Sequence, residues 1–335
     1  MLIRRDINPK DYLDLKDDRE KLVFLCKLAN LAPSSHNMQP WFFRIMEKSI
    51  TLIPNPYLRL KVADPQGREF YITFGTVVGL MKLIAHSYGL KFEFRFSDNL
   101  ETEIGRFIFT DLRSTGVDHN TLKAIIRRHN SRLPYRHDAL PEGFINILRS
   151  FDASVGELKI ISDQSTQRKI EIVILNSVKE AFADKFFCEE LYPWLKNSWF
   201  RFEDGLPGYN LGVPFLFSWV FPYLTRRGLT SNKQVEIHGR MLSNAAVYCI
   251  ICGDQDQDKA WISIGEAFIQ IAVEAERNGI SIGIMQAAIE NASDRVRLQE
   301  ILNTKKLPQM FFRLGYCDLT HKHSPRRGMD KVIVK

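Results

Sequence analysis

Two stretches of this sequence repeat one pattern, which limits the chain to folds built from two similar units. Apolar residues recur at helical spacing in one helix bracketed by Gly75 and Gly89, and in another bracketed by Gly265 and Gly279. The glycines of each pair are fourteen residues apart, and an extended segment and a Phe-rich strand follow each helix. The chain is therefore predicted to hold two copies of one αβ unit, divided near residues 112–120.

The elements around this repeat alternate between amphipathic helices and short strands, which predicts an α+β fold with helices around antiparallel or mixed sheets. Helices are expected over residues 17–31, 74–88, 120–128, 142–148, 166–187, 261–278 and 293–301. Strands are expected over residues 41–46, 50–53, 92–96, 105–111, 160–161, 245–252 and 309–316. The first half is predicted to cover residues 1–115 and the second residues 116–335, with an irregular, aromatic-rich insertion at 188–235.

The charge pattern bears on which partners the chain can bind. The formal net charge is +7, but Lys and Arg are scattered among acidic residues. Nucleic-acid binding needs a clustered basic face with interleaved aromatics, and the sequence has no such cluster. A few arginines around one phosphate group are a simpler use of local positive charge. We therefore expect an anionic small-molecule cofactor, and no nucleic acid, as partner.

The five cysteines are expected to be free thiols, because their number is odd and the N-terminal residues 1–6 contain no apolar signal region. Cys249 and Cys252 form a C-x-x-C pattern inside the apolar run 245–252. Residues three apart on a strand point to opposite faces, so these two sulfurs should diverge. Two buried thiols are the preferred interpretation, and a redox pair or metal site is the alternative.

The most apolar stretch, residues 211–224, is not expected to span a membrane. Pro214 and Pro222 interrupt it, and it is shorter than the roughly 20 residues that a spanning helix needs. We expect a cytoplasmic protein in which this stretch is buried or forms a lid. Association with a membrane surface is the minor alternative.

Residues 32–41 form a proline-bounded polar loop between a helical run and an aromatic strand. The loop concentrates two hydroxyls, a carboxamide and free backbone N–H groups, which suit hydrogen bonding to a flat heteroaromatic ligand. A simple turn before an edge strand is the alternative. A hydrolase using Ser35 and His36 is a weaker one, because sequence neighbours rarely form a nucleophile and its base and no G-x-S-x-G elbow surrounds them.

This loop resembles the A-P-S-x-x-N-x-Q-P-W loop of the nitroreductase family, whose members are FMN-dependent proteins of α+β fold. In ordinary members the loop crosses the dimer interface and touches the flavin held by the partner subunit. The resemblance implies that Ser34, Ser35, Asn37 and Gln39 contact FMN.

A second candidate segment is the basic run 128–132 at the end of a short helix. Its guanidinium forks match phosphate oxygens, although a solvated basic helix end is the alternative. With the sequence that follows, the run resembles the R-x-S-x-R-x-F...P segment of nitroreductases. The resemblance places Arg128 and Asn130 at the FMN phosphate, with His129 between them, and Arg132 at the pyrimidine edge of the flavin. Asn130 replaces the usual Ser.

Two further segments match the family. Residues 279–287 resemble a loop that lies against the isoalloxazine and supplies backbone N–H groups near N5; a strand and turn between two helices is the alternative. The implied contacts there are Ile284, Met285, Gln286 and Ala287. Residues 324–330 resemble the terminal basic segment, where an arginine closes over the phosphate; Arg326 is the better match and Arg327 the second.

The matching segments are divided between the two halves. The first half keeps the 33–41 loop, while its own start, residues 3–7, is a poor phosphate motif. The second half keeps the 128–132 run, while residues 152–158 replace its Pro-Ser loop. One FMN site per chain, across an internal pseudo-two-fold axis, is therefore expected in a monomer. This arrangement resembles the single-chain, Acg-like branch of the family, in which gene duplication mimics the homodimer.

The resemblance implies an NAD(P)H-dependent oxidoreductase that reduces nitroaromatic or quinone-type acceptors through N5 of FMN. The flavin performs the redox chemistry, so no catalytic side chain and no metal is required. The alternative is an FMN storage or sequestration protein whose lid blocks turnover. The two differ in whether an aromatic residue of the insertion, such as Trp199, Phe200, Tyr209 or Trp219, covers the flavin face.

Overall fold

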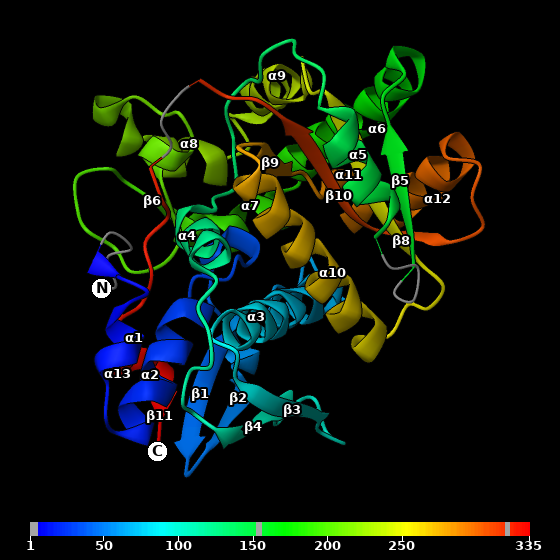
Figure 1. Cartoon of the computed structure of the whole chain (residues 1–335). Helices are drawn as coiled ribbons and strands as arrows, with labels where there is room; N and C mark the ends of the chain where they lie inside the picture. Colours follow the sequence, from blue (N-terminus) through cyan, green and yellow to red (C-terminus); the bar gives the residue numbers. More distant parts are fainter. Residues whose placement is uncertain (1–5, 152–155, 319–321) are drawn as a thin grey trace.

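The computed structural model describes residues 6–151, 156–318 and 322–335, and two sheets organise it (Figure 1). The first sheet has the order β11-β1-β2-β4-β3 and the second the order β5-β8-β10-β9. The strands of the first sheet are β1 (Trp41–Met46), β2 (Ser49–Pro54), β3 (Lys91–Phe96), β4 (Gly105–Asp111) and β11 (Ile333–Val334). Those of the second are β5 (Glu157–Ile161), β8 (Val247–Gly253), β9 (Ser281–Ile284) and β10 (Leu307–Gly315). The α+β prediction is confirmed.

The two sheets have matching topology. The neighbours in β1-β2-β4-β3 are all antiparallel, and so are those in β5-β8-β10-β9. In each sheet one long helix joins the second strand to the strand at the edge: α3 (Arg68–Ser87) follows β2, and α10 (Asp258–Arg277) follows β8. This correspondence supports the predicted internal repeat, and the duplication itself stays a prediction. Parts of the two degenerate segments, residues 3–5 and 152–155, lie outside the described residues.

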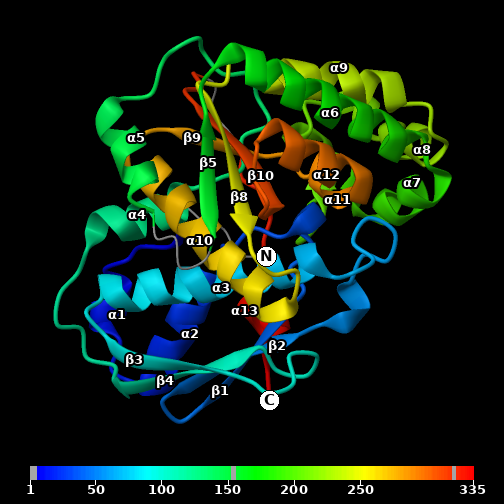
Figure 2. The same ribbon diagram turned by 90° about the vertical axis from the view of Figure 1, so that its right-hand side faces the viewer.

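Helices α3 and α10 lie between the two sheets and cross at a pair of glycines (Figure 2). A Cβ on Gly75 would lie 2.8 Å from the Cα of Gly265 and would overlap the carbonyl oxygen of Ile262. A Cβ on Gly265 would lie 2.8 Å from the Cα of Gly75 and would overlap the carbonyl oxygen of Ile72. The absence of side chains at both positions lets the two backbones touch. By length and hydropathy α3 could cross a bilayer, but 83% of its most apolar window is buried in this core.

We expect Gly75→Ala to lower the free energy of unfolding by about 3 kcal/mol, because the added methyl group forces the two helices apart. The matched control is Gly143→Ala in α5 (Glu142–Arg149), where a Cβ would meet nothing within 4 Å. Alanine favours helix at that position, so the control should be neutral or stabilising by about 0.5–1 kcal/mol. Urea denaturation measures both, and equal effects would contradict the close crossing.

The second sheet separates two apolar cores. One core lies between the sheets around α3 and α10, and includes Cys249. The other lies on the opposite face, where Cys252 packs with Tyr248 and Phe311 against α6 (Gln164–Ala183). Both thiols are buried and all five cysteines are free, so the expectation of divergent, unpaired thiols is confirmed. The groups of His, Cys, Asp and Glu in the described ranges include no candidate metal site.

The predicted helix 166–187 is wrong at its C-terminal end. It stops at Ala183, and α7 (Lys185–Leu191) begins after Asp184, whose carboxylate accepts a hydrogen bond from the N–H of Phe186. The insertion is also more regular than expected, since it includes α8 (Phe221–Arg226) and α9 (Ser231–Leu242) and the short strands β6 (Leu195–Lys196) and β7 (Leu206–Pro207). The remaining helices are α1 (Asp11–Asp14), α2 (Asp18–Ala29), α4 (His119–Arg127), α11 (Ala287–Glu290), α12 (Ala292–Ile301) and α13 (Met329–Val332).

The C-terminal segment returns to the first sheet. Strand β11 pairs in parallel with β1, with Ile333 opposite Phe43. The second half of the chain therefore reaches across the first, and residues 324–327 lie beside the 34–39 loop.

Candidate functional site

Two adjoining cavities lie where the halves of the chain meet. The first, called the polar cavity, has a volume of about 250 Å³, and the second, the apolar cavity, about 260 Å³. They share a boundary, formed by Pro33, Ser34, Asn130, Arg132, Leu206 and Ile284. The boundary residues come from the first half, the second half and the insertion, so all three parts of the chain build the site.

The 34–39 loop has an unusual backbone. His36, Asn37 and Gln39 all have positive φ values of 49–57°, which cost free energy for residues other than glycine unless neighbours fix them. Asn37 does so by donating from Nδ2 to the carbonyl oxygens of Gly205 and Pro325, both at 3.1 Å. Gln39 donates to the carbonyl oxygen of Glu203 at 2.8 Å. The loop is thus held by the insertion and by the C-terminal segment.

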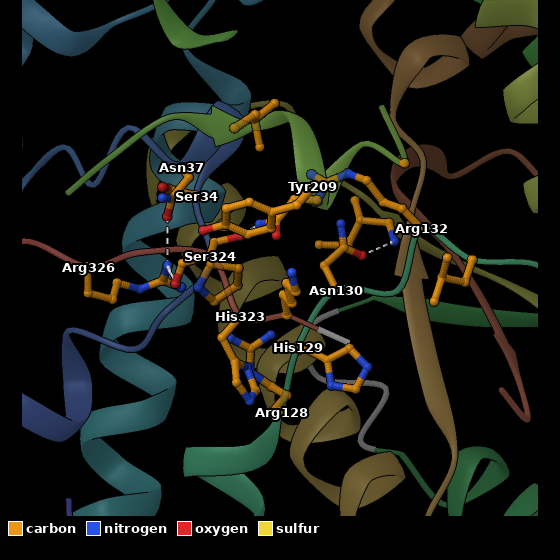
Figure 3. Close-up of a pocket in the computed structure, with 17 residues that line it drawn as sticks. Ser34, Asn37, Arg128, His129, Asn130, Arg132, Tyr209, His323, Ser324 and Arg326 are labelled. Atoms are coloured by element: carbon orange, nitrogen blue, oxygen red, sulfur yellow. Dashed lines mark hydrogen bonds between the residues drawn. The ribbon is translucent and has the colours of Figure 1, made fainter. Parts of the chain in front are cut away.

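Arg326 is the main clamp on this loop. Its guanidinium donates to the carboxamide oxygen of Asn37 at 2.7 Å, a contact visible in Figure 3. Its other donors bond main-chain carbonyls, those of Asn30, Leu31, Ala32, Ser324 and Pro325. Burial, with Arg128 nearby, lowers the pKa of Arg326 to about 9. Arg326 lines the polar cavity, but its N–H groups are engaged by the chain itself.

Gln39 and Arg327 line neither cavity. The carboxamide oxygen of Gln39 accepts from the backbone N–H of Arg327 at 2.9 Å, and the Arg327 guanidinium pairs with Asp204 at 2.7 Å. Both residues predicted at the cofactor therefore act in this structure as supports behind the 34–39 loop.

The polar cavity is basic at one end. Arg128 is 2% exposed and His129 lies next to it, with Lys322, His323 and Ser324 completing the wall (Figure 3). Burial lowers the pKa of Arg128 to about 10. Two nearly buried guanidinium groups, Arg128 and Arg326, give this end a positive charge, which favours an anionic ligand.

Arg132 stands at the boundary of the two cavities, on the side away from Arg326 (Figure 3). Within the described residues its guanidinium makes no hydrogen bond and no ion pair, and burial lowers its pKa to about 10. Beside it, the carboxamide oxygen of Asn130 accepts from the N–H of Ile284 at 2.7 Å. This bond joins two of the segments predicted from the sequence and leaves the Nδ2 group of Asn130 facing the cavity.

The apolar cavity is lined by Met285, Ala287 and aromatic residues of α6, α7 and α8, which are Phe182, Phe187 and Phe221. Two acids also line it, Glu69 and Glu290. Sequence reasoning missed both. Glu69 lies in the first turn of the apolar helix α3, where a carboxylate among buried residues was the available signal.

Glu69 connects two of the predicted cofactor residues. Its carboxylate accepts from the Ser35 hydroxyl at 3.3 Å and from the Gln286 amide at 2.7 Å. Gln286 also accepts from the N–H of Phe311 at 2.8 Å, so its side chain is held in place on both sides. The Ser35 hydroxyl is therefore directed to an acid. Burial, with Arg132 nearby, lowers the pKa of His36 to about 4, which makes it a weak base and gives no support to the hydrolase alternative.

Because Glu69 and Glu290 lie close together in the apolar cavity, we expect the free energy of unfolding to depend on pH. Burial, with Glu69 nearby, raises the pKa of Glu290 to about 8. The folded state therefore holds a proton that the unfolded state releases near pH 4.5, so stability falls as pH rises from about 4.5 to about 8. We expect Glu290→Gln to raise the free energy of unfolding by about 2 kcal/mol at pH 8.5 and to change it little at pH 4.5.

Urea denaturation of the flavin-free protein across this pH range measures the effect. Glu300→Gln, at an exposed position of α12, is the matched control and should leave the pH dependence unchanged. An unchanged slope for Glu290→Gln would contradict a protonated, buried carboxyl.

The four aromatic residues of the insertion that the sequence analysis named lie in different places. Tyr209 lines the polar cavity, and its ring extends across it (Figure 3). Trp199, Phe200 and Trp219 are exposed, with 51–71% of their surface accessible, and line neither cavity. The aromatic cover of the apolar cavity comes from Phe221 and the two phenylalanines of α6 and α7 instead.

No family model matches this sequence. The chain is nevertheless similar along nearly its whole length to a Mycobacterium tuberculosis protein named as an NAD(P)H nitroreductase, with 23% identity over 94% of this chain and 92% of that protein. This likeness agrees with the resemblance of the sequence to nitroreductases. A Serratia protein also named as an NAD(P)H nitroreductase is 20% identical, with 91% of each chain covered.

Solved nitroreductases share a more distant likeness. A Desulfitobacterium hafniense nitroreductase with bound FMN aligns with 64% of this chain and 98% of its own, at a TM-score of 0.43 and 14% identity. In this chain, the loop from the first half and the 128–132 and 284–287 segments from the second half line one pair of cavities.

Proposed function

We propose that this chain is an FMN-binding, NAD(P)H-dependent oxidoreductase that reduces nitroaromatic or quinone-type acceptors. The observation that supports it most is Arg132. Within the described part of the chain its guanidinium has unused donors, and it stands between a basic, polar cavity and an apolar one. The chemical groups of FMN follow the same order as the walls of the two cavities: an anionic phosphate, a hydroxylated chain, a polar pyrimidine edge and an apolar ring.

The residues fit FMN in one orientation. Arg128, with His129 and Asn130, would hold the phosphate, and Ser34 would contact the ribityl chain. Arg132 would donate to the pyrimidine edge, and the 284–287 backbone and Ser35 would lie beside the ring. Bound FMN supplies the hydride and electron chemistry. The chain's own residues bind and orient the flavin, and the apolar walls exclude water from the ring.

A single-chain architecture follows from the same proposal. Each half lacks one of the segments that an ordinary nitroreductase dimer uses twice, and the segments that remain line one pair of cavities. The matching sheets and the Gly75–Gly265 crossing support a duplicated gene, as in the Acg-like branch. One FMN per monomer, in the cytoplasm, is the expected form.

Sequestration of FMN is the second candidate function, favoured by the roof of the apolar cavity. Leu206, Leu211 and Phe221 of the insertion line this cavity, so the insertion covers part of the space proposed for the flavin ring. If the roof does not open, a bound flavin can be reduced by small reductants but not by NAD(P)H.

The visible absorption of the FMN-loaded protein, recorded anaerobically before and after NAD(P)H, tests the proposal. Bleaching within seconds, followed by recovery on addition of a quinone or nitroaromatic, is the expected result. Reduction by dithionite but not by NAD(P)H would favour sequestration. A protein that binds no flavin would overturn both.

Arg132→Leu gives a test of the orientation. We expect it to weaken FMN and riboflavin to the same extent, about 10- to 100-fold, because both ligands share the pyrimidine edge and a charged donor is lost. The free energy of unfolding without flavin should not fall, since an unpaired cation is removed. Fluorescence titration measures the affinities, and a loss confined to FMN would place Arg132 at the phosphate instead.

A further inference from the structure

The insertion exposes several large apolar residues. This set is called the lid outer face and consists of Trp199, Phe215, Leu216, Phe217, Trp219 and Tyr223. Leu216 is 73% exposed, Phe217 68% and Trp219 66%. Side chains this apolar are seldom left together in water unless they serve an interaction.

The same segment is two-sided. Ser218, Pro222 and Thr225 are buried, and Phe221 lines the apolar cavity. The Ser218 hydroxyl accepts from the N–H of Ser198 at 3.0 Å, which fixes the short helix Phe215–Ser218 on the underlying chain. The exposed residues therefore belong to a seated, folded segment. Figure 1 shows α8 at the edge of the molecule, away from both sheets.

Basic residues border the lid outer face. A cavity of about 610 Å³ beside Tyr223 is lined by Lys185, Arg226 and Arg227, with Glu189 as the acid among its lining residues. All three cations are exposed, and Arg201 adds another in the insertion. The insertion has four acids: Glu203 and Asp204 pair with Lys331 and Arg327, Glu190 accepts from the backbone N–H groups of residues 61–63, and Glu189 lines this cavity. With three cations and one acid, the lining of this cavity is positive.

We propose that the lid outer face docks on the surface of an anionic phospholipid bilayer. Trp, Phe and Leu would enter the boundary between headgroups and acyl chains, where amphipathic segments with aromatic residues are stable. The cavity beside Tyr223, lined by Lys185, Arg226 and Arg227, would face lipid phosphates. A second copy of the chain fits less well, because it would bring the same arginines toward each other. The net charge of +7 favours the same partner at longer range.

This binding needs no flavin and is independent of the proposed reaction. Leu206, Leu211 and Phe221 of the insertion line the apolar cavity. Docking of the lid outer face would therefore place the proposed flavin site next to the bilayer.

Sedimentation of the full-length protein with vesicles tests the proposal. The probes are vesicles of phosphatidylcholine alone and vesicles of equal parts phosphatidylcholine and phosphatidylglycerol. Binding to the mixed vesicles is expected, with a blue shift of tryptophan emission from Trp199 and Trp219. High salt should weaken the binding, because the charged groups are exposed.

The double variant Leu216→Glu, Phe217→Glu should bind the mixed vesicles at least about tenfold more weakly, because two apolar side chains no longer leave water. The control is Ile172→Glu, Val296→Glu, which makes the same change at exposed positions of α6 and α12 outside the lid. Arg227→Gln should weaken binding about fivefold on the mixed vesicles only.

Three results would overturn the proposal: no binding of the unmodified protein to the mixed vesicles, an equal loss in the control variant, or a dimer in analytical ultracentrifugation that the lid variant dissociates. Loss of flavin binding alone would affect the proposed function and leave this inference standing.

Discussion

Replacing Arg128 with Met is expected to weaken FMN binding by about 10²- to 10³-fold, while riboflavin affinity changes by less than about threefold. Arg128 is almost fully buried at the basic end of the polar cavity. Removing one partner of a buried charge pair costs about 3–5 kcal/mol, and each 1.4 kcal/mol is a factor of ten in affinity. Riboflavin lacks the phosphate and therefore does not use this contact. Titration of the flavin-free protein with both ligands measures the ratio.

The neighbouring residue provides the control. Arg127 is exposed and pairs with Glu276 at 3.3 Å, so Arg127→Met removes the same charge without entering the cavity. It should leave both affinities within about twofold. If Arg128→Met weakened riboflavin as much as FMN, the phosphate would not lie at this end of the site.

Arg326→Met is expected to lower the free energy of unfolding of the flavin-free protein by about 3 kcal/mol or more. The guanidinium joins the end of α2, the 34–39 loop and the C-terminal segment through carbonyl oxygens, and its removal leaves several buried acceptors unpaired. Urea denaturation measures the loss. A methionine also removes a buried charge, which offsets part of the cost.

Arg326→Lys separates geometry from charge. Lysine keeps the positive charge but lacks the planar fork that reaches both sides of the loop. We expect it to recover less than half of the stability lost in Arg326→Met. A stable Arg326→Met protein with weakened FMN binding would instead assign Arg326 to the phosphate directly, as the sequence resemblance implies.

The parts of the fold that sequence analysis located are those with strong periodicity. Helices α3 and α10 each carry apolar residues at helical spacing over about five turns, and the apolar run 245–252 predicted the strand observed as β8 (Val247–Gly253). Gly75 and Gly265 were expected to begin the two repeated helices, but both lie inside them, at a crossing that the sequence did not predict.

Other features depended on tertiary contacts that local pattern does not contain. The helical periodicity continues through Asp184, but its carboxylate caps α7 and ends α6. The pairing of β11 with β1 joins residues far apart in the sequence. Local pattern therefore did not predict that the C-terminal segment pairs with a strand of the first sheet.

In the candidate site, too, some residues could be predicted from the sequence and others depended on tertiary contacts. Motif resemblance named Ser34, Asn130, Arg132 and Ile284, and the structure brings all four to the boundary of the cavities. It did not name Glu69, because an acid in the first turn of a helix normally reflects the helix dipole. The resemblance also did not show which arginine is available to a ligand. The guanidinium of Arg326 donates to the chain itself, whereas that of Arg132 makes no hydrogen bond within the described residues.

The measurement that tests the account most directly is a titration of the flavin-free protein with FMN, followed by visible absorption and flavin fluorescence. We predict saturation at one FMN per chain, with riboflavin bound at least about 100-fold more weakly because the basic end of the polar cavity is unused. Saturation at two FMN per chain would contradict the single composite site. Equal affinities for FMN and riboflavin would contradict the phosphate end, and no binding would contradict the account as a whole.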